Sequence, residues 1–411
     1  TMAVDKQDKV LNVPNLRFPE FKDEWELHPT TDFFEFKNGL NPDSKRFGSG
    51  TKFISVMDIL NNRYITYDKI KAFVEPKGND LNEFGVNYGD VLFQRSSETL
   101  EDVGRANVYL DNKTALFGGF VIRGKKIGKY NPLFFRYLLS SPHVRKRIVV
   151  KGAGAQHFNI GQDGLSKISI FVPTTKEQER IAQLLDLIDE RIEVQIRIIE
   201  KLQSLMKGLN DYLQDSVPLS YSMSFSDIGD TYSGLSGKSA EDFGSGKPYI
   251  TYISIYANTF VDDDCCGKVS VDKSEKQNVV LKGDMLFTLS SETPEEVCYG
   301  AVYSGNSTET YLNSFCFGVR NSEGKVFSPY MAYFFNSSRF RREVYPLAQG
   351  STRFNLQKSD FMKKQFSYPS IDDQHRIFEI LNAYDNKLKA EAQILVHYQH
   401  QKEFLLRNLF I

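Results

Sequence analysis

The chain has 411 residues, a formal net charge of −1, an apolar share of 41% and a charged share of 25%. This length exceeds one ordinary core, so we expect at least two domains. The balanced charge excludes nucleic-acid binding by bulk positive charge alone but leaves room for local basic faces. No apolar run approaches the ~20 residues of a membrane span. Four cysteines without a CxxC pattern favour a reducing compartment, so we expect a cytoplasmic protein without membrane contact.

The chain begins with an expected arm at 1–13, followed by a first globular domain at 14–175. Its alternating, aromatic-rich runs predict strands, and its proline-initiated runs predict helices. The predicted strands lie at 52–59, 91–94 and 117–123, and the predicted helices at 132–140 and 143–150. This mixture predicts an α+β fold class.

Residues 176–216 predict one long helix, ~60 Å long at about 1.5 Å per residue. Its apolar residues recur at alternating steps of three and four, broken only at Gln195, which indicates a coiled-coil seam. The seam residues are Ile181, Leu185, Ile188, Ile192, Ile199 and Leu202. Such a helix needs a partner, because its seam would otherwise face water.

We expect that partner at 372–411, after a second globular domain at 217–371. This C-terminal helix repeats the seam at an offset of 196 (377 − 181), with Glu391 standing where the central helix has Gln195. Its seam residues are Ile377, Leu381, Leu388 and Leu395. Two copies of one helix predict an antiparallel intramolecular coiled coil that joins two domains with pseudo-two-fold symmetry.

The globular domains also repeat. FGSG at Phe47 recurs at Phe243, and GDVLFQRSSET at 89–99 returns as GDMLFTLSSET at 283–293. GAQHFNI at 154–160 returns as GSTRFNL at 350–356. The sequence is therefore a tandem pair of domain-plus-helix units, much longer than a solenoid repeat.

Motifs of self-sufficient catalysis are missing from the sequence. There is no GxxxxGK[ST] phosphate loop, no HExxH metal pair and no DPPY- or NPPF-type tetrapeptide for a flipped adenine. GSGTK at Gly48 and GSGK at Gly244 have the wrong spacing for a phosphate cradle, and we interpret them as glycine turns. SSET in both halves lacks a recurring histidine, so we predict no catalytic residue and no metal site.

Basic residues concentrate at 121–160, which contains no Asp or Glu. Such a face suits a phosphate backbone, although a solvated helix surface would show the same pattern. The predicted phosphate contacts are Arg145, Lys146, Arg147 and Lys151 in the first domain, and Arg339, Arg341 and Arg342 in the second.

With these features in place, the chain resembles the specificity subunits of type I restriction–modification systems. The resemblance rests on LRFPEFKDEW near the start, the two GD-LF-SSET segments, the GAQHFNI and GSTRFNL loops, and VPTTKEQERIAQLLDLID with its echo YPSIDDQHRIFEILNAYD. It covers essentially the whole chain.

The resemblance implies two target recognition domains, each reading one half of a gapped double-stranded DNA site. It implies two modification subunits that dock on the long helices, bind S-adenosylmethionine and methylate adenine, and motor–nuclease subunits that join them for restriction. No cofactor is then expected in this chain, which would be a non-catalytic subunit.

Segments shared by both domains cannot distinguish two different half-sites, so we expect base contacts where the domains differ. The candidates are Lys45, Arg46, Gln94, Arg95, Gln156 and His157 in the first domain, and Lys238, Lys247, Thr288, Thr352 and Arg353 in the second.

Two other functions fit the sequence less well: a free-standing DNA methyltransferase, and a coiled-coil scaffold that binds no DNA. The duplication also predicts that a fragment ending at Ser216 would pair with itself and recognise an interrupted palindrome.

Overall fold

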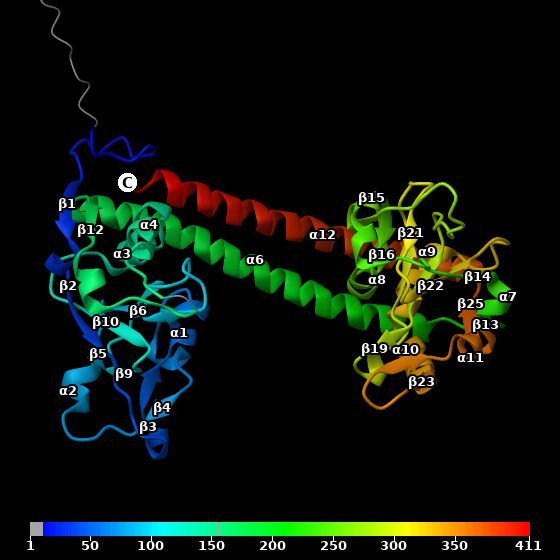
Figure 1. Ribbon diagram of the computed structural model, residues 1–411, viewed down its shortest axis with the longest axis horizontal. Coiled ribbons are helices and arrows are strands. Elements are labelled where there is room, and N and C mark those ends of the chain that lie inside the picture. The colour runs from blue at the N-terminus through cyan, green and yellow to red at the C-terminus, as the bar shows by residue number, and fades with distance from the viewer. Residues whose placement is uncertain (1–10, 155) are drawn as a thin grey trace, which may run out of the picture. The chain divides into compact units, whose positions relative to one another are not determined.

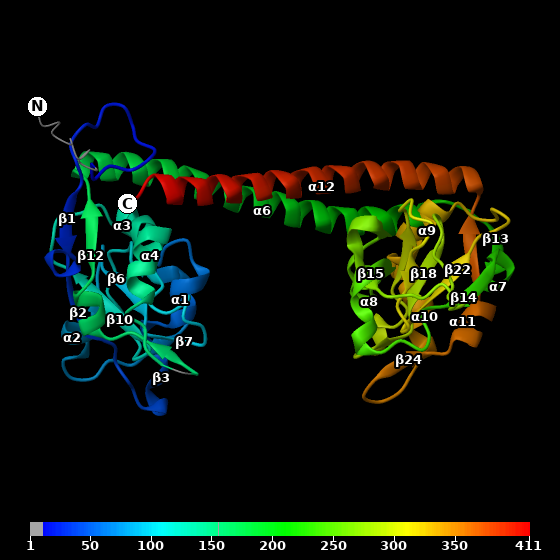
Figure 2. The same cartoon turned by 45° about the horizontal axis from the view of Figure 1, so that its top comes forward.

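The computed structural model describes residues 11–154 and 156–411 and divides into two units. Unit 1 contains residues up to 196 together with 393–411, and unit 2 contains 197–392. Each unit combines a mixed α+β body with one part of each long helix, α6 (Thr175–Ser216) and α12 (Ile371–Asn408) (Figures 1 and 2). The α+β fold class is confirmed. Most of the predicted arm, 1–10, lies outside the described residues.

The body of unit 1 contains two four-stranded sheets, with strand orders β2-β10-β6-β8 and β4-β3-β9-β5, and two short ladders, β1-β12 and β7-β11. Its strands are β1 (Glu26–Pro29), β2 (Phe34–Asn38), β3 (Phe47–Ile54), β4 (Phe73–Val74), β5 (Gly85–Val86), β6 (Val91–Gln94), β7 (Ser96–Ser97), β8 (Ala106–Val108), β9 (Ala115–Phe117), β10 (Val121–Lys126), β11 (Phe158–Asn159) and β12 (Ser169–Val172). Its helices are α1 (Val56–Asn61), α2 (Asp80–Phe84), α3 (Pro132–Ser140), α4 (Pro142–Val149) and α5 (Gln162–Ser166).

The body of unit 2 repeats this plan with a five-stranded sheet, β14-β22-β18-β20-β16, and the smaller sheets β17-β15-β21, β19-β24-β23 and β13-β25. Its strands are β13 (Leu219–Ser224), β14 (Asp230–Ser233), β15 (Phe243–Ile250), β16 (Phe260–Val261), β17 (Cys266–Val269), β18 (Met285–Thr288), β19 (Ser290–Ser291), β20 (Gly300–Tyr303), β21 (Tyr311–Leu312), β22 (Cys316–Arg320), β23 (Ala348–Gln349), β24 (Phe354–Leu356) and β25 (Gln365–Pro369). Its helices are α7 (Phe225–Ile228), α8 (Tyr252–Ala257), α9 (Ser328–Phe335), α10 (Ser338–Val344) and α11 (Lys358–Lys363).

Helix α3 begins where the sequence predicts, and α4 begins at Pro142, one residue before the predicted start, because both starts carry a cap and a proline. The side chain of Asn131 accepts from the Phe134 N–H, and that of Ser141 accepts from the Val144 N–H. Proline follows each cap, at a position whose N–H would have no helical partner. The predicted strand at 52–59 was wrong in its second half: β3 ends at Ile54, and Ser55 with Asp58 forms a capping box that starts α1.

The core of each unit joins the body to the long helices. In unit 1, Ile181 and Leu185 of α6 share one buried cluster with Phe134 of α3 and with Leu405 and Phe410 at the end of α12. In unit 2, the buried cluster contains Ile377 and Leu381 of α12, with Met206, Leu209 and Leu213 of α6 packed against it. Burying both helices beside the body explains why neither seam faces water there.

The two helices run antiparallel where unit 1 contains both. Asp189 contacts Lys402, and Arg191, further along α6, stacks on Tyr398, which comes earlier in α12. Seam residues near the bodies are fully buried, including Ile181, Leu185 and Leu381. The remaining seam residues Ile192, Ile199, Leu202, Leu388 and Leu395 are half-buried.

Candidate nucleic-acid interface

In each unit, the fold brings the SSET segment and the glycine loop together as neighbouring strands. In unit 1, β7 pairs antiparallel with β11, and the Ser96 hydroxyl donates to Asn159 Oδ1 at 2.6 Å. In unit 2, β19 pairs with β24 in the same way. The SSET and FN residues that the two units share therefore build a common framework, while Gln156, His157, Thr352 and Arg353, which differ between the units, lie at the loop tips.

The glycine that starts each loop is required by the backbone. Gly154 has φ 146° and Gly350 has φ 137°. A Cβ at these positions would lie only 2.0 Å from the His157 carbonyl oxygen and 2.1 Å from that of Arg353, respectively. Glycine alone avoids this clash. The described tip residues Gln156, His157, Thr352 and Arg353 are all exposed.

An exposed phenylalanine stands near the SSET segment in both units, and our sequence analysis did not select it. Phe120 is 69% exposed and Phe315 is 58% exposed. Their side chains are presented from a fixed backbone, because the Phe120 carbonyl accepts from the Arg95 N–H and the Phe315 carbonyl from the Leu289 N–H, both at 2.9 Å. This phenylalanine recurs at an offset of 195 (315 − 120), just before a buried strand in each unit. That recurrence is the sequence signal by which it could have been selected.

A hollow adjoins this phenylalanine in each unit. In unit 1 it measures about 420 Å³ and its lining includes Phe47, Met57 and Phe120. In unit 2 it measures about 370 Å³ and is lined differently, by Tyr252, Tyr256, Glu292, Phe315 and Arg353 among others. We call the SSET segment, the glycine-loop tip and this phenylalanine with its hollow the reading face of each unit.

The side chains of Arg145 and Arg341, predicted as phosphate contacts, bind backbone carbonyls inside their own units. The Arg145 guanidinium donates to the carbonyls of Glu101 and Val103, both at 2.7 Å. Arg341 makes the equivalent bonds to Glu295 and Val297, both at 2.6 Å. Burial lowers the pKa of Arg145 to about 10 and also lowers the pKa of Arg341. These two arginines hold the loop that follows each SSET segment.

Other predicted contacts also have structural roles, because their side chains are occupied inside the unit. Thr288 is fully buried and accepts from the Tyr299 N–H, and Gln94 is 6% exposed and donates to the Ser96 carbonyl. Arg46 is 9% exposed and binds the Glu75 carbonyl and Asp80. The remaining cases are Arg147 on the Ser169 carbonyl, Arg339 on the Ser367 carbonyl and Lys238 on Glu275.

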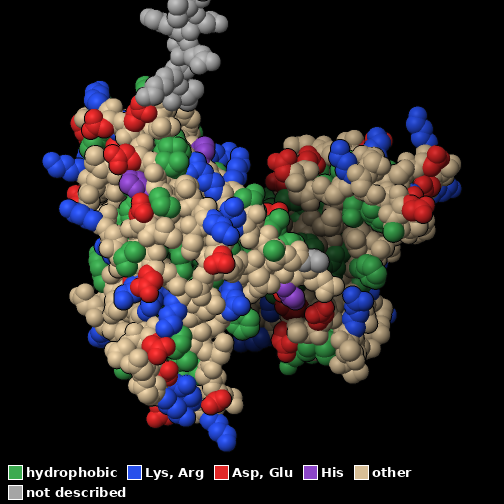
Figure 3. All heavy atoms as spheres, turned by 60° about the vertical axis from the view of Figure 1, so that its left-hand side comes forward, with side chains coloured by type: hydrophobic (Ala, Val, Ile, Leu, Met, Phe, Trp, Pro, Cys, Tyr) green, Lys and Arg blue, Asp and Glu red, His purple; other side chains and the backbone are tan. Residues whose placement is uncertain are grey.

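Apart from Arg353, the predicted basic residues that reach solvent are Lys45, Lys146, Lys151, Lys247 and Arg342, with Arg95 half-buried. Lys247 forms an ion pair with Glu309. On the face seen in Figure 3, Lys and Arg side chains are interspersed with Asp and Glu rather than gathered in one stripe. On this face, charge alone therefore does not mark an interface.

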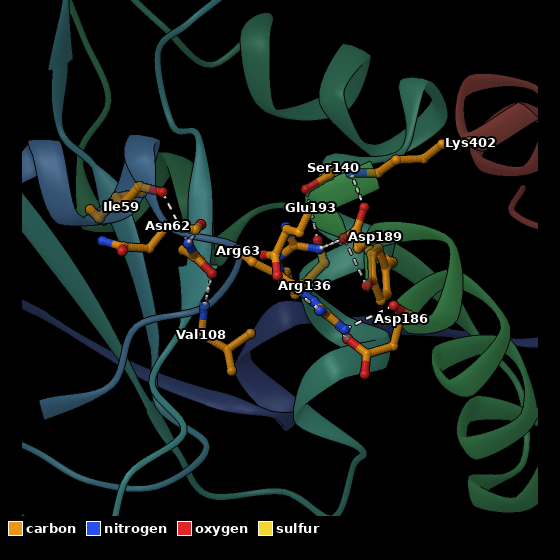
Figure 4. Close-up of polar contacts among 12 residues, drawn as sticks. Ile59, Asn62, Arg63, Val108, Arg136, Ser140, Asp186, Asp189, Glu193 and Lys402 are labelled. Atoms are coloured by element: carbon orange, nitrogen blue, oxygen red, sulfur yellow. Dashed lines mark hydrogen bonds and ion pairs between the residues drawn. The ribbon is translucent and has the colours of Figure 1, made fainter. Parts of the chain in front are cut away.

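Asp189 anchors α6 to both α3 and α12 within unit 1. It accepts from Arg136 at 3.0 Å, from the Tyr137 hydroxyl at 2.9 Å and from Lys402 at 2.6 Å. Figure 4 shows Arg136 and Lys402 reaching Asp189 from different elements. Burial raises the pKa of Asp189, but Arg136 and Lys402 outweigh it and hold the pKa below its usual range.

Arg63 makes a second anchor between the body and α6. Its guanidinium donates to the Asp186 carbonyl at 2.8 Å and lies 3.5 Å from Glu193 (Figure 4). Nearby, a cleft of about 960 Å³ carries charges of both signs, including Arg105, Lys402, Glu101 and Glu403. This mixture does not suit a phosphate backbone.

A second apolar stripe lies on α6 outside the seam, at steps of seven and four residues. Its members are exposed by 38% to 68%: Leu187, Val194, Ile198, Leu205 and Tyr212. These side chains are apolar surface that lies outside the seam.

The described residues contain neither a helix long and apolar enough to cross a membrane nor a group of three or more His, Cys, Asp or Glu side chains arranged to hold a metal ion.

Comparison with known proteins adds a family to this geometry. The family model described as the type I restriction modification DNA specificity domain matches the chain twice, at residues 22–204 and 223–397. The chain is 25% identical over 205 residues to the putative type I restriction enzyme MjaX specificity subunit of Methanocaldococcus jannaschii, covering 48% of this chain and 47% of that protein. It is 26% identical over 153 residues to the EcoKI specificity subunit of Escherichia coli K12, covering 36% and 32%. The aligned region thus spans half or less of either relative.

Solved structures show the same fold. The S subunit of a type I restriction–modification system from M. genitalium superimposes with a TM-score of 0.52 at 16% identity, covering 97% of this chain and 99% of that one. A chain from a study of the assembly and conformational transition of a type I R-M system gives a TM-score of 0.59 at 13% identity, covering 94% and 98%.

Proposed function

Because the chain belongs to the family of type I restriction–modification DNA specificity subunits, we propose that it binds a gapped double-stranded DNA site, with one half-site on the reading face of each unit. A DNA-recognition role follows from the family, and the division into two half-sites is the proposal. The supporting observation is that one framework occurs twice with different tips: Gln156 and His157 in unit 1, Thr352 and Arg353 in unit 2.

The chemistry of the tips suits direct readout of bases. Glutamine pairs with adenine and arginine with guanine through bidentate contacts in the major groove. The exposed Phe120 and Phe315 add apolar contact surface of the kind that packs on a thymine methyl group. The framework serines and the exposed Lys146, Lys151 and Arg342 are suited to sugar–phosphate contacts that position the duplex without reading it.

We assign methylation and cleavage to partner subunits rather than to this chain. Two modification subunits carrying S-adenosylmethionine would dock on the exposed stripe of α6 and its counterpart on α12, and motor–nuclease subunits would join through them. On α12, Ile380, Ile394, Val396 and Phe404 are exposed by 38% to 58%, which supplies apolar surface there too. The chain then acts as the non-catalytic reader of the complex.

The test is selection of DNA by the chain assembled with its modification subunits. A pool with two random blocks separated by gaps of different length is bound, recovered and sequenced. We expect a site of two short blocks at one preferred gap. Gln156→Ala should relax one block only and Arg353→Ala the other only, each by about 1–3 kcal/mol for a bidentate contact.

Matched controls are Gln203→Ala and Lys273→Ala, exposed residues remote in sequence from the glycine loops. They should leave both blocks unchanged. Absence of sequence-selective binding would instead favour the scaffold function. Adenine methylation by the isolated chain would favour the free-standing methyltransferase.

A further inference from the structure

The end of α12 packs on the α3–α4 pair in unit 1. The end of α6 packs on the equivalent α9–α10 pair in unit 2. The offset of 196 aligns Phe410, which lies just beyond the last residue of α12, with Gln214 of α6, and Phe134 with Tyr330. The two contacts can therefore be compared residue by residue.

The contact in unit 1 is apolar. Phe410 is 1% exposed, and its ring lies 5.6 Å from that of Phe134 and 6.3 Å from that of Trp25, measured between centroids. Leu405 of α12 and Leu409, which follows the helix, are also buried. Phe410, Leu405 and Leu409 offer no polar group to this contact, and the Trp25 indole N–H donates to Glu177 instead.

The contact in unit 2 is polar at the same place. The buried Tyr330 hydroxyl donates to Gln214 Oε1 at 2.6 Å, and Gln214 is 1% exposed. One turn earlier, Asn210 is 5% exposed and its amide donates to the Tyr333 carbonyl at 2.9 Å. Gln214 also donates to Asn210 Oδ1 at 3.3 Å. Each of these buried polar groups has a hydrogen-bond partner in unit 2. Unit 1 offers only some of the equivalent partners, because Phe134 lacks the hydroxyl.

A third position strengthens the difference. Asp211 accepts from the Ser338 N–H at 2.7 Å and from the Ser338 hydroxyl at 2.6 Å, at the start of α10. The equivalent residue at the start of α4 is Pro142, which has neither donor. On α12 the position of Asp211 is taken by Arg407, whose carbonyl contacts His143 at 3.1 Å.

We propose that these contacts match each helix end to one unit only: the end of α12 to α3 and α4, and the end of α6 to α9 and α10. A second copy's α6 seated on unit 1 would place Gln214 over Phe134 and Asp211 over Pro142. Leaving the buried amide of Gln214 and the half-buried carboxylate of Asp211 without their donors is unfavourable. The chain therefore selects its own C-terminal helix over symmetric pairing with a second copy. This runs against the self-pairing that the duplication alone predicts, and it does not depend on DNA reading.

The test uses the full-length chain and two double-mutant cycles, which isolate the interaction between paired positions. The first combines Phe410→Gln with Phe134→Tyr, which installs the unit 2 pair in unit 1. The second combines Tyr330→Phe with Gln214→Leu, which installs an apolar pair in unit 2. Amide hydrogen exchange of 402–410 and 206–214 reports each contact separately. The single tryptophan, Trp25, reports unit 1 by fluorescence because it packs against Phe410.

We expect Phe410→Gln alone to lower protection of 402–410 on the order of tenfold or more, since it buries an unpaired amide. Adding Phe134→Tyr should recover a large part of that loss, while 206–214 stay unchanged. Tyr330→Phe should lower protection of 206–214, and adding Gln214→Leu should recover it. Phe410→Leu, which remains apolar, should show no coupling to Phe134→Tyr.

The proposal is overturned if neither cycle shows coupling, so that each second substitution only adds to the first. If Phe410→Gln releases the helix end completely, the milder Tyr330→Phe cycle decides by the same criterion.

Discussion

Gln178 and Gln374, 196 positions apart (374 − 178), make the same two hydrogen bonds in the two units. Gln178 Nε2 donates to the Pro173 carbonyl at 2.9 Å, and its Oε1 accepts from the Asn131 N–H at 2.9 Å. Gln374 Nε2 donates to the Pro369 carbonyl at 3.0 Å, and its Oε1 accepts from the Phe327 N–H at 2.9 Å. Both side chains are buried. Each glutamine ties the first turn of a long helix to the start of a body helix.

We therefore predict that Gln178→Leu destabilises unit 1 and Gln374→Leu destabilises unit 2, each by about 1–3 kcal/mol, because two buried backbone groups lose their partner. Hydrogen exchange of α3 and α9 measures the two effects separately. The exposed Gln203→Leu is the control and should change neither helix. An equal loss of hydrogen-exchange protection in α3 and α9 after a single substitution would show that the anchors are not local.

Asp189 should make unit 1 sensitive to acid. A carboxylate whose pKa is lowered by folding stabilises the folded state above its unfolded pKa of about 3.9, and this contribution is lost as the pH falls through the lower folded value. Asp189→Asn should lower stability near neutral pH and flatten its decline between about pH 5 and pH 2. Urea unfolding followed by Trp25 fluorescence measures both. An unchanged acid slope would assign the decline to other carboxylates.

Arg145 and its neighbour Lys146 should respond differently to alanine. Arg145→Ala removes the hold on the Glu101 and Val103 carbonyls, so the loop after SSET should exchange faster and selectivity for one half-site should fall. Lys146→Ala should weaken binding to all sequences alike and reduce the salt slope of log K by about 0.9 if it contacts one phosphate. DNA binding at several salt concentrations, with hydrogen exchange, distinguishes them. A salt effect from Arg145→Ala with an unchanged loop would restore its phosphate role.

The exposed stripe on α6 should be needed for assembly. Leu205→Asp and Tyr212→Asp place charges on residues that are 53% and 68% exposed, so folding should be preserved. Because desolvating a carboxylate opposes docking, we expect at least a tenfold weaker association with the modification subunits. Ser204→Asp, an exposed neighbour outside the stripe, is the control. Sedimentation of the mixed subunits measures the loss, and undiminished assembly of both variants would place the docking surface elsewhere.

The sequence by itself determined the duplicated α+β plan and both long helices. These features are indicated by hydrophobic periodicity and by repeated sequence segments. The helix α3 was predicted with its actual bounds because its cap and proline are local signals. The strand at 52–59 was overextended because the Ser55–Asp58 capping box also fits a polar alternation.

Only the tertiary structure decided which basic residues reach solvent. Arg145 and Lys146 look alike in sequence, but one faces backbone carbonyls across the unit and the other faces water. The same holds for Thr288, which differs between the repeats and yet is fully buried. It also decided which helix end fits which unit, because Gln214 is an ordinary polar residue until Tyr330 is placed against it. Burial and long-range hydrogen bonds depend on neighbours far apart in the chain, and no local pattern encodes them.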